Sequence, residues 1–155
     1  MLTNLAIFAS GNGSNAENIF HYFSTSPTIK INLLLTNNKT AKVIDRFRQY
    51  NVPIVIIDNS LANNGNFLIN ICNAFEIDLI ILSGYLRTVP ESLIEKYPNK
   101  ILNIHPALLP KYGGKGMYGA KVHEAVISNN EKYSGITIHI VNQNYDDGEI
   151  IFQHK

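Results

Sequence analysis

The sequence predicts an α/β fold: a doubly wound, mostly parallel sheet flanked by helices, with a mixed strand pair at its C-terminal end. Three observations support this fold class. Five short runs are mostly apolar rather than alternating, as in strands that are buried on both faces. Stretches with helical spacing separate these runs, as the crossover connections between parallel strands require. Beyond them, one strand-like run alternates between apolar and polar residues, which is typical of a half-exposed strand.

The expected elements follow one another in a regular order. The apolar runs place strands at 5–9, 29–35, 52–57, 79–82 and 101–105. Helical spacing places helices at 16–23, 41–50, 67–75 and 90–96. A helix at 120–127, an alternating strand at 136–141, a polar loop at 142–148 and a final strand at 149–153 complete the order. A proline- and glycine-rich stretch without periodicity lies at 106–118. A loop of this length inside a compact domain is usually functional or disordered.

Length and composition predict a single domain over residues 1–155. The net charge is +1, from 13 basic and 12 acidic residues without a run of Lys or Arg, so we expect no nucleic-acid partner. The first residues lack the basic region of a signal peptide, and no apolar run approaches the roughly 18–20 residues of a membrane span. The single cysteine, Cys72, sits among apolar residues, which favours a buried thiol in a reducing compartment. We therefore expect a cytoplasmic protein.

The residues after the first expected strand favour anion binding. Ligands of open α/β sheets bind at the carboxyl ends of the strands, where Gly11 and Gly13 precede a helix. Glycines let the backbone approach a ligand, and the first N–H groups of a helix favour a phosphate. The stretch also matches the dinucleotide pattern G-x-G-x-x-G/A, but Thr-Asn-Asn at 36–38 replaces the acidic residue that binds the ribose, which argues against NAD. The alternative is a tight turn in which Ser14 or Asn15 caps the helix.

A second polar group lies at the carboxyl end of the fifth expected strand. Asn103 and His105 are two residues apart, so their side chains project from the same side of a strand. An amide N–H stabilises an oxyanion, and an imidazole transfers a proton near neutral pH. The alternative is a structural histidine. Asp146 and Asp147 lie in the last loop, where a carboxylate would favour a charged histidine, and the alternative there is an ordinary Asp-Gly turn.

The other candidates carry weaker signals. Arg87 follows the fourth expected strand and is either a surface charge or a ligand contact. The remaining histidines have no evident partners, and we expect them to be partly exposed or structural: His21, His123, His139 and His154. No set of His, Cys, Asp and Glu has the spacing of metal ligands, so we expect no metal.

Four segments of the chain match the motifs of one family. They are Gly11-Asn-Gly-Ser-Asn15, Ser83-Gly-Tyr-Leu-Arg87, Ile101-Leu-Asn-Ile-His-Pro-Ala-Leu-Leu-Pro-Lys-Tyr112 and Asp146-Asp-Gly-Glu-Ile150. Together they resemble the phosphoribosylglycinamide formyltransferases, folate-dependent enzymes of purine synthesis. The His-Pro-x-Leu-Leu-Pro-Lys segment is typical of folate formyltransferases as a group, and the first loop narrows the resemblance to the glycinamide ribonucleotide enzymes. The resemblance runs from Leu5 to the last residue and implies a Rossmann-like formyltransferase fold.

The resemblance implies a role for each matching residue. The first loop would bind the phosphate of the ribonucleotide, through Gly11, Asn12, Gly13, Ser14 and Asn15. Two segments would bind the folate, through Leu86, Arg87, Thr88 and Val89 and through Asn142, Gln143, Asn144, Tyr145 and Asp146. The catalytic residues would be Asn103, His105 and Asp146. Spacing from the alternating strand favours Asp146 over Asp147 as the aspartate of this set.

The implied reaction transfers the formyl group of 10-formyltetrahydrofolate, a cosubstrate, to the amine of 5-phosphoribosylglycinamide in de novo purine (IMP) biosynthesis. The amine attacks the formyl carbon, and Asn103 and protonated His105 stabilise the negative oxygen. His105 also moves a proton, and Asp146 orients His105 and favours its charged form. The implied partners are these two small molecules, without nucleic acid, membrane or metal, and a homodimer is an open alternative.

The sequence departs from the family pattern in two respects, and two other functions compete with formyl transfer. Family members usually continue into a further strand and a long helix, so we expect this domain to lack the family's C-terminal strand and helix. The loop after His105 is glycine-rich at 112–119 and longer than usual, which we interpret as a subgroup feature. One competing function is a formyltetrahydrofolate deformylase, which hydrolyses the formyl group. The other is a nucleotide- or folate-binding module without turnover.

Overall fold

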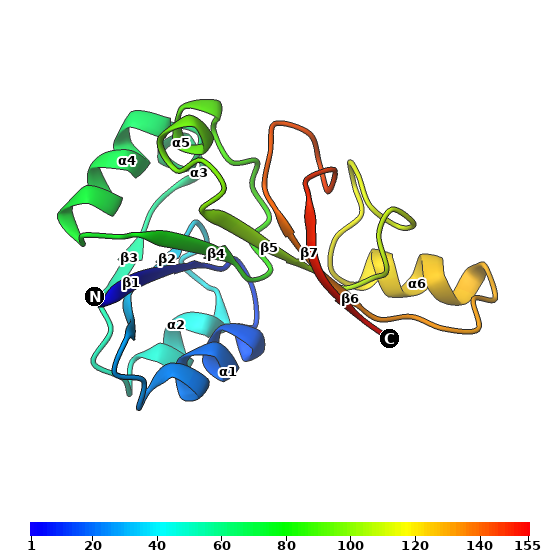
Figure 1. Cartoon of the computed structure of the whole chain (residues 1–155), viewed down its shortest axis with the longest axis horizontal. Coiled ribbons are helices and arrows are strands. Elements are labelled where there is room, and N and C mark those ends of the chain that lie inside the picture. Colours follow the sequence, from blue (N-terminus) through cyan, green and yellow to red (C-terminus); the bar gives the residue numbers. More distant parts are fainter.

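A single seven-stranded sheet forms the frame of the protein in a computed structural model, which describes all residues 1–155 (Figure 1). The strands are β1 (Thr3–Phe8), β2 (Ile29–Thr36), β3 (Ile54–Ile56), β4 (Leu79–Leu82), β5 (Ile101–His105), β6 (Ile136–Ile140) and β7 (Ile150–His154). Their order across the sheet is β3-β2-β1-β4-β5-β6-β7. The first five strands are parallel, and β6 and β7 each pair antiparallel with the preceding strand. This topology confirms the predicted fold class.

Helices cover both faces of the parallel part of the sheet (Figure 1). One face carries α1 (Ser14–Phe23) and α2 (Lys42–Phe47), and the other carries α3 (Asn59–Ala62), α4 (Gly65–Ala74) and α5 (Glu91–Lys96). The last helix, α6 (Ala120–Ser128), lies at the distal end, near β6 (Figure 1). The sheet therefore has a helix-covered region and an open region around β7.

The continuous apolar runs are explained by two separate cores, one on each face of the sheet. Along β1, Ala6 and Phe8 pack into the core under α4 and α5, while Leu5 and Ile7 pack into the core under α1 and α2. Successive strand residues point to opposite faces, so a strand covered on both sides is apolar at every position. Cys72 lies in the first of these cores with no exposed surface, and this burial raises the pKa of its thiol to about 12. The predicted buried thiol is confirmed.

Several element boundaries differ from the sequence prediction. The one-turn helix α3 was not expected; it begins where the Asp58 carboxylate accepts the Leu61 N–H at 2.8 Å. Helix α4 begins at Gly65, two residues before the predicted start, because the Asn64 side chain accepts the Phe67 N–H at 3.1 Å. A side-chain oxygen of this kind satisfies a free N–H of the first turn and fixes the start of a helix.

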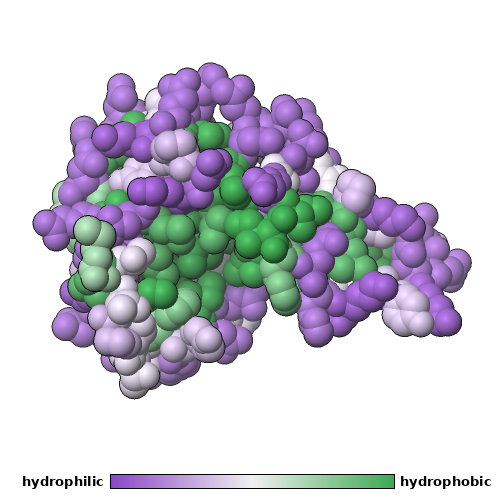
Figure 2. Space-filling model, in the orientation of Figure 1, coloured by the Kyte–Doolittle hydropathy of each residue, from purple (hydrophilic) through white to green (hydrophobic).

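Other predicted elements are shorter or shifted. The helix predicted at 41–50 is α2 and ends at Phe47, and the strand predicted at 52–57 is reduced to three residues in β3. Strand β7 runs one residue later than its predicted range of 149–153. All five of its residues are exposed, including Ile150, Ile151 and Phe152 at 44%, 54% and 50%. Figure 2, drawn in the orientation of Figure 1, shows apolar side chains gathered across the middle of the molecule.

Candidate functional site

The carboxyl end of β5 and the facing part of β6 form the centre of the candidate site. Asn103 and His105 lie on the same side of β5, and the antiparallel register places His139 of β6 directly opposite Asn103. The Asn103 amide nitrogen lies 3.1 Å from His139 Nε2 and donates to Asp146 Oδ1 at 3.3 Å. His105 Nδ1 lies 3.6 Å from the same carboxylate oxygen. The structure therefore brings together the three predicted catalytic residues and adds a second histidine.

Asp146 reaches this cluster from the loop between β6 and β7. Its backbone has a positive φ of 53°, a conformation that only a minority of residues other than glycine adopt. Asp146 Oδ2 accepts the Gly114 N–H at 2.9 Å, and a Cβ atom on Gly113 would come within 3.1 Å of Asp146 Cβ. The glycine-rich loop therefore packs directly on the carboxylate. The neighbouring Asp147 takes no part in the cluster; its Oδ2 accepts an amide N–H of Asn144 at 3.0 Å.

The surroundings of Asp146 keep its carboxyl group ionised. Burial raises the pKa of this group, because the charged form loses hydration. A hydrogen bond from the His139 side chain and another from the Gly114 N–H lower the pKa, and positive charge on His105 and His139 lowers it further. The net result is an Asp146 pKa below its ordinary value. A carboxylate is therefore available beside two imidazoles at neutral pH.

The His105 ring is buried, with one nitrogen hydrogen-bonded to a carbonyl oxygen and the other facing the Asp146 carboxylate. The side chain is 3% exposed, and its Nε2 lies 2.7 Å from the Tyr112 carbonyl oxygen, opposite the side that faces Asp146. A carbonyl oxygen only accepts, so Nε2 carries a hydrogen in this arrangement. The carbonyl group of Tyr112 therefore occupies the Nε2 edge of the imidazole.

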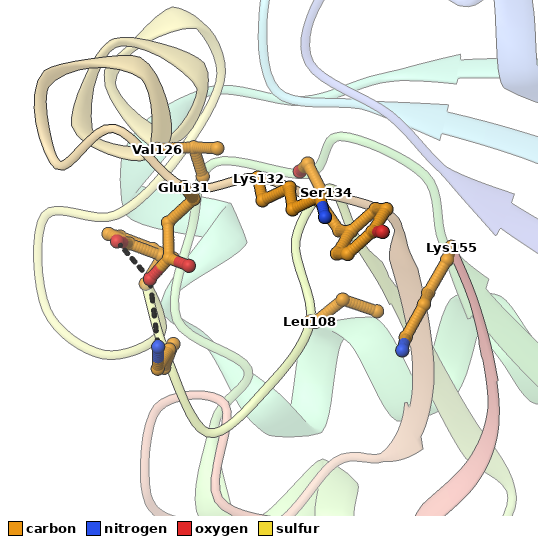
Figure 3. Close-up of a pocket in the computed structure, with 9 residues that line it drawn as sticks. Leu108, Val126, Glu131, Lys132, Ser134 and Lys155 are labelled. Carbon is orange, nitrogen blue, oxygen red and sulfur yellow. Dashed lines mark hydrogen bonds and ion pairs between the residues drawn. The ribbon is translucent and has the colours of Figure 1, made fainter.

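The peptide over His105 is anchored from behind. The Tyr112 hydroxyl donates to Glu131 Oε1 at 2.9 Å, and Lys111 Nζ binds the same oxygen at 2.8 Å. These groups line a cavity of about 260 Å³ near α6, where Figure 3 shows Glu131 at the meeting point of the two bonds. The hydrogen bonds from Lys111 and Tyr112 hold the pKa of Glu131 below its ordinary value. The glycine-rich loop is therefore bound to Glu131 on one side and to Asp146 and His105 of the candidate site on the other.

His139 is the site residue that the sequence analysis missed. We expected it to be partly exposed or structural and without partners; it is 2% exposed, and its Nδ1 donates to the Ile140 carbonyl at 2.9 Å. Its Nε2, 3.5 Å from Asp146 Oδ1, accepts from the Asn103 amide when the ring is neutral and faces the carboxylate with an N–H when the ring is charged. The signal available in the sequence was the two-residue spacing of His139 from Thr137, which places both side chains on one face of the strand. That face is buried in the structure. His21 also has a partner, the Tyr50 hydroxyl at 2.9 Å from its Nε2.

The predicted phosphate loop leads directly into the first turn of α1. Gly13 caps α1 with a φ of 78°, and no side chain accepts a hydrogen bond from the first turn, so the alternative of a Ser14 or Asn15 cap is wrong. The first N–H groups of a helix have no partners within the helix. They are left free to bind an anion, and the positive end of the helix dipole favours one there. The Ser10 N–H donates to the Gly84 carbonyl at 3.1 Å, which joins this loop to the segment after β4.

We expect Gly13→Ala to destabilise the protein by about 2 kcal/mol or more. An added Cβ would lie 2.8 Å from the Val43 Cα atom, and the positive φ strains any residue with a side chain. Gly11→Ala is the matched control, because a Cβ there meets nothing within 4 Å. Urea unfolding of both variants measures the difference, and equal midpoints would contradict the packing argument.

The residues predicted to bind folate lie on two segments that the structure brings together. The Thr88 and Tyr145 hydroxyls are 2.6 Å apart, and the Gln143 side chain donates to the Glu91 carboxylate. Leu86 is 51% exposed, whereas Val89 is 8% exposed and packs into the core. Arg87 binds Asn63 Oδ1 at 3.2 Å through Nη2, and its buried Nε has no partner. The Asn142 side chain accepts the Asn144 N–H at 2.9 Å, within the loop itself.

Neither a membrane-spanning helix nor a metal-binding cluster is found in the structure. None of the helices has the length and apolar character to cross a membrane. No cluster of three or more His, Cys, Asp and Glu side chains is placed to hold a metal ion.

Comparison with known proteins gives consistent matches. The family model for formyl transferases matches residues 3–155. Phosphoribosylglycinamide formyltransferase of Bacillus subtilis is 36% identical over 153 residues, which cover 96% of this chain and 76% of the relative. The chloroplastic enzyme of Arabidopsis thaliana is 39% identical over 155 residues, covering 96% of this chain and 53% of the relative. The chain thus spans about half the length of the plant relative.

Comparison with solved structures points to the same family. Glycinamide ribonucleotide transformylase 1 of Geobacillus kaustophilus has a TM-score of 0.88 at 30% identity, over 99% of this chain and 82% of the other. Phosphoribosylglycinamide formyltransferase of Bacillus halodurans has a TM-score of 0.83 at 34% identity, over 98% and 78%. The relatives and solved structures named above are phosphoribosylglycinamide formyltransferases and a glycinamide ribonucleotide transformylase, and the chain belongs to the formyl transferase family.

Proposed function

We propose that the protein is a formyltransferase that moves the formyl group of 10-formyltetrahydrofolate to the amine of 5-phosphoribosylglycinamide, a step of de novo purine biosynthesis. One observation carries the proposal: Asn103, His105 and Asp146 converge at the carboxyl end of β5, with Asp146 Oδ1 at 3.3 Å from the amide and 3.6 Å from the imidazole. The names of the relatives support the substrate pair, since formyl transfer to this ribonucleotide is what those enzymes are named for.

In this proposal the amine nitrogen attacks the formyl carbon, and the carbonyl oxygen becomes negative. The Asn103 amide and an N–H of His105 stabilise that oxygen, a contribution of about 3–4 kcal/mol for one such donor. The bond to the folate nitrogen then breaks, and the proton that the amine loses passes to that nitrogen with His105 as the carrier. Asp146 holds the imidazole in orientation throughout. The product ribonucleotide carries the formyl group as an amide.

The proposed chemistry requires two internal hydrogen bonds to be exchanged. The Asn103 amide nitrogen faces Asp146 and His139, and His105 Nε2 faces the Tyr112 carbonyl. A substrate oxygen would replace one acceptor at each donor. The second exchange moves peptide 112 away from the imidazole, so the glycine-rich loop adjusts when substrate enters.

The two binding subsites of the proposal flank this centre. The loop at 11–15 would bind the ribonucleotide phosphate through its free N–H groups. The segments at 86–89 and 142–146, joined by the contact between Thr88 and Tyr145, would bind the folate. The folate is a cosubstrate, and the proposed reaction needs no metal. The proposal also includes a cytoplasmic location, which cell fractionation tests. It includes a homodimer as well, which light scattering tests.

The test is a formyl-transfer assay with 10-formyltetrahydrofolate, run with and without 5-phosphoribosylglycinamide. We expect loss of the formyl donor only when the ribonucleotide is present, with one formylated ribonucleotide formed per donor consumed. Donor loss without the ribonucleotide would instead identify a hydrolase, in which water replaces the amine. Binding of both ligands without turnover would identify a binding module. Either of the last two results overturns the proposed reaction.

A further inference from the structure

An arginine outside every sequence motif connects the proposed phosphate loop to a neighbouring helix. Arg46 lies on α2, and its Nε donates to the Asn12 carbonyl at 2.8 Å. Its Nη2 lies 3.3 Å from Asn12 Oδ1. One turn earlier, the Val43 N–H donates to the Gly11 carbonyl at 3.1 Å. Helix α2 therefore binds two consecutive carbonyl groups of the loop.

These bonds set the direction in which the loop's N–H groups point. In a trans peptide the C=O and the following N–H point in opposite directions. Because α2 binds the carbonyls of Gly11 and Asn12, the N–H groups of Asn12 and Gly13 point away from α2. Successive N–H groups that share a direction form a concave anion site. The free N–H groups at the start of α1 extend this surface.

The Arg46 guanidinium is engaged by a protein carboxylate rather than left open for a ligand. Its Nη1 pairs with Glu17 Oε2 at 2.5 Å, in the first turn of α1. Glu17 also accepts the Tyr50 hydroxyl at 3.0 Å. The hydrogen bond from Tyr50, and after it the pairing with Arg46, hold the pKa of Glu17 below its ordinary value. Without Arg46, the ionised Glu17 carboxylate would lose its ion-pair partner in the first turn of α1, the helix whose free N–H groups belong to the proposed phosphate site.

We propose that Arg46 is a positioning residue for the ribonucleotide phosphate. It holds Asn12 in place and neutralises Glu17, so that the loop after β1 presents its N–H groups to a phosphate monoester. The inference rests on the proposed function and adds to it a residue that lies behind the loop and does not touch the ligand.

The first test compares Arg46→Met with Arg48→Met. Arg48 lies directly after α2, its side chain is 71% exposed, and it pairs with Asp45 at 2.7 Å. The two substitutions remove the same charge, but only the first touches the loop. We expect Arg46→Met to raise the KM for 5-phosphoribosylglycinamide about ten- to a hundredfold, with the KM for the formyl donor unchanged. Arg48→Met should change either KM by less than about twofold.

Two more variants separate the two roles of Arg46. Arg46→Lys keeps a positive charge beside Glu17 but lacks the forked donors that reach Asn12, so we expect an intermediate KM. In the double variant Glu17→Gln/Arg46→Met the repulsive carboxylate is gone, and we expect part of the loss to be recovered. If Arg46→Met does not fold, as judged by thermal unfolding, these two variants provide the comparison with wild type. An unchanged ribonucleotide KM, or an equal rise in both KM values, overturns the inference.

Calorimetric titration with ribose 5-phosphate makes the inference testable without turnover. We expect ribose 5-phosphate to bind wild type and Arg48→Met alike, and to bind Arg46→Met about ten- to a hundredfold more weakly. If wild type lacks formyl transfer but gives this binding pattern, the proposed reaction fails and the role of Arg46 stands. Equal affinity in wild type and Arg46→Met, or no binding to wild type, overturns the role of Arg46.

Discussion

His105→Ala and Asn103→Ala are each expected to abolish measurable formyl transfer while leaving the protein folded. A positioned acid or base contributes about 10²–10⁴-fold to a rate, and one oxyanion donor about 10²–10³-fold. Both side chains lie on a strand whose backbone pairing does not depend on them. Single-turnover assays with saturating ligands measure the loss directly, and circular dichroism reports the fold.

An exposed histidine provides the control for these variants. His123 lies on α6, outside the site, and its side chain is exposed, so His123→Ala should keep the wild-type rate. A folded His105→Ala or Asn103→Ala protein with a rate near wild type would remove the residue from the catalytic set. The proposed mechanism would then need another donor for the negative oxygen.

Asp146→Asn is expected to lower kcat by about a hundredfold or more, because a neutral amide no longer presents a charged acceptor that orients the imidazole. Asp147→Asn is the matched control, since Asp147 is exposed and binds only within its own loop. The control substitution removes the same charge at the adjacent position and leaves Asp146 in contact with Asn103 and the two histidines. An equal fall in kcat for both variants would show that net charge, rather than the cluster, sets the rate.

The same substitution has an effect on stability with a definite sign. The Asp146 pKa is lowered in the folded protein, from an ordinary value of about 3.9 in an unfolded chain. The ionised group therefore stabilises the fold above that value, and the contribution is lost as the pH falls through the lowered folded pKa. The stability difference between wild type and Asp146→Asn should shrink as the pH falls below about 4. Urea unfolding at each pH measures it, and a difference independent of pH would contradict the shift.

The parallel part of the fold was predictable because its strands are buried on both sides. Each such strand contains a mostly apolar run, and the intervening helices show their own period, so both element type and order can be inferred. The helix α3 was not predictable in the same way. It is a single turn without periodicity, and its cap at Asp58 resembles an ordinary turn residue in the sequence.

The clustering of Asn103, His105 and Asp146 was predictable from motifs, although their roles remain predictions. His139 and Arg46 were not found, for a physical reason. His139 meets Asn103 through the register of two antiparallel strands, which local sequence does not specify when both faces contain polar residues. Arg46 reaches Asn12 across 34 residues and two different elements. Contacts of this kind arise from tertiary packing and leave no mark at either position alone.

Because β7 is an exposed edge strand, we expect it to open before the rest of the protein unfolds. It pairs with β6 alone, all five of its residues are exposed, and the Asp146 loop is suspended between the two. Regions with few buried contacts open locally at a lower free-energy cost than the whole domain. Amide hydrogens of β7 therefore exchange ahead of those in β1 and β4. On warming, we expect the Asp146 carboxylate to leave the two imidazoles while the Gly11–Asn15 turn and its helices are still intact, so the proposed activity should be lost before global melting.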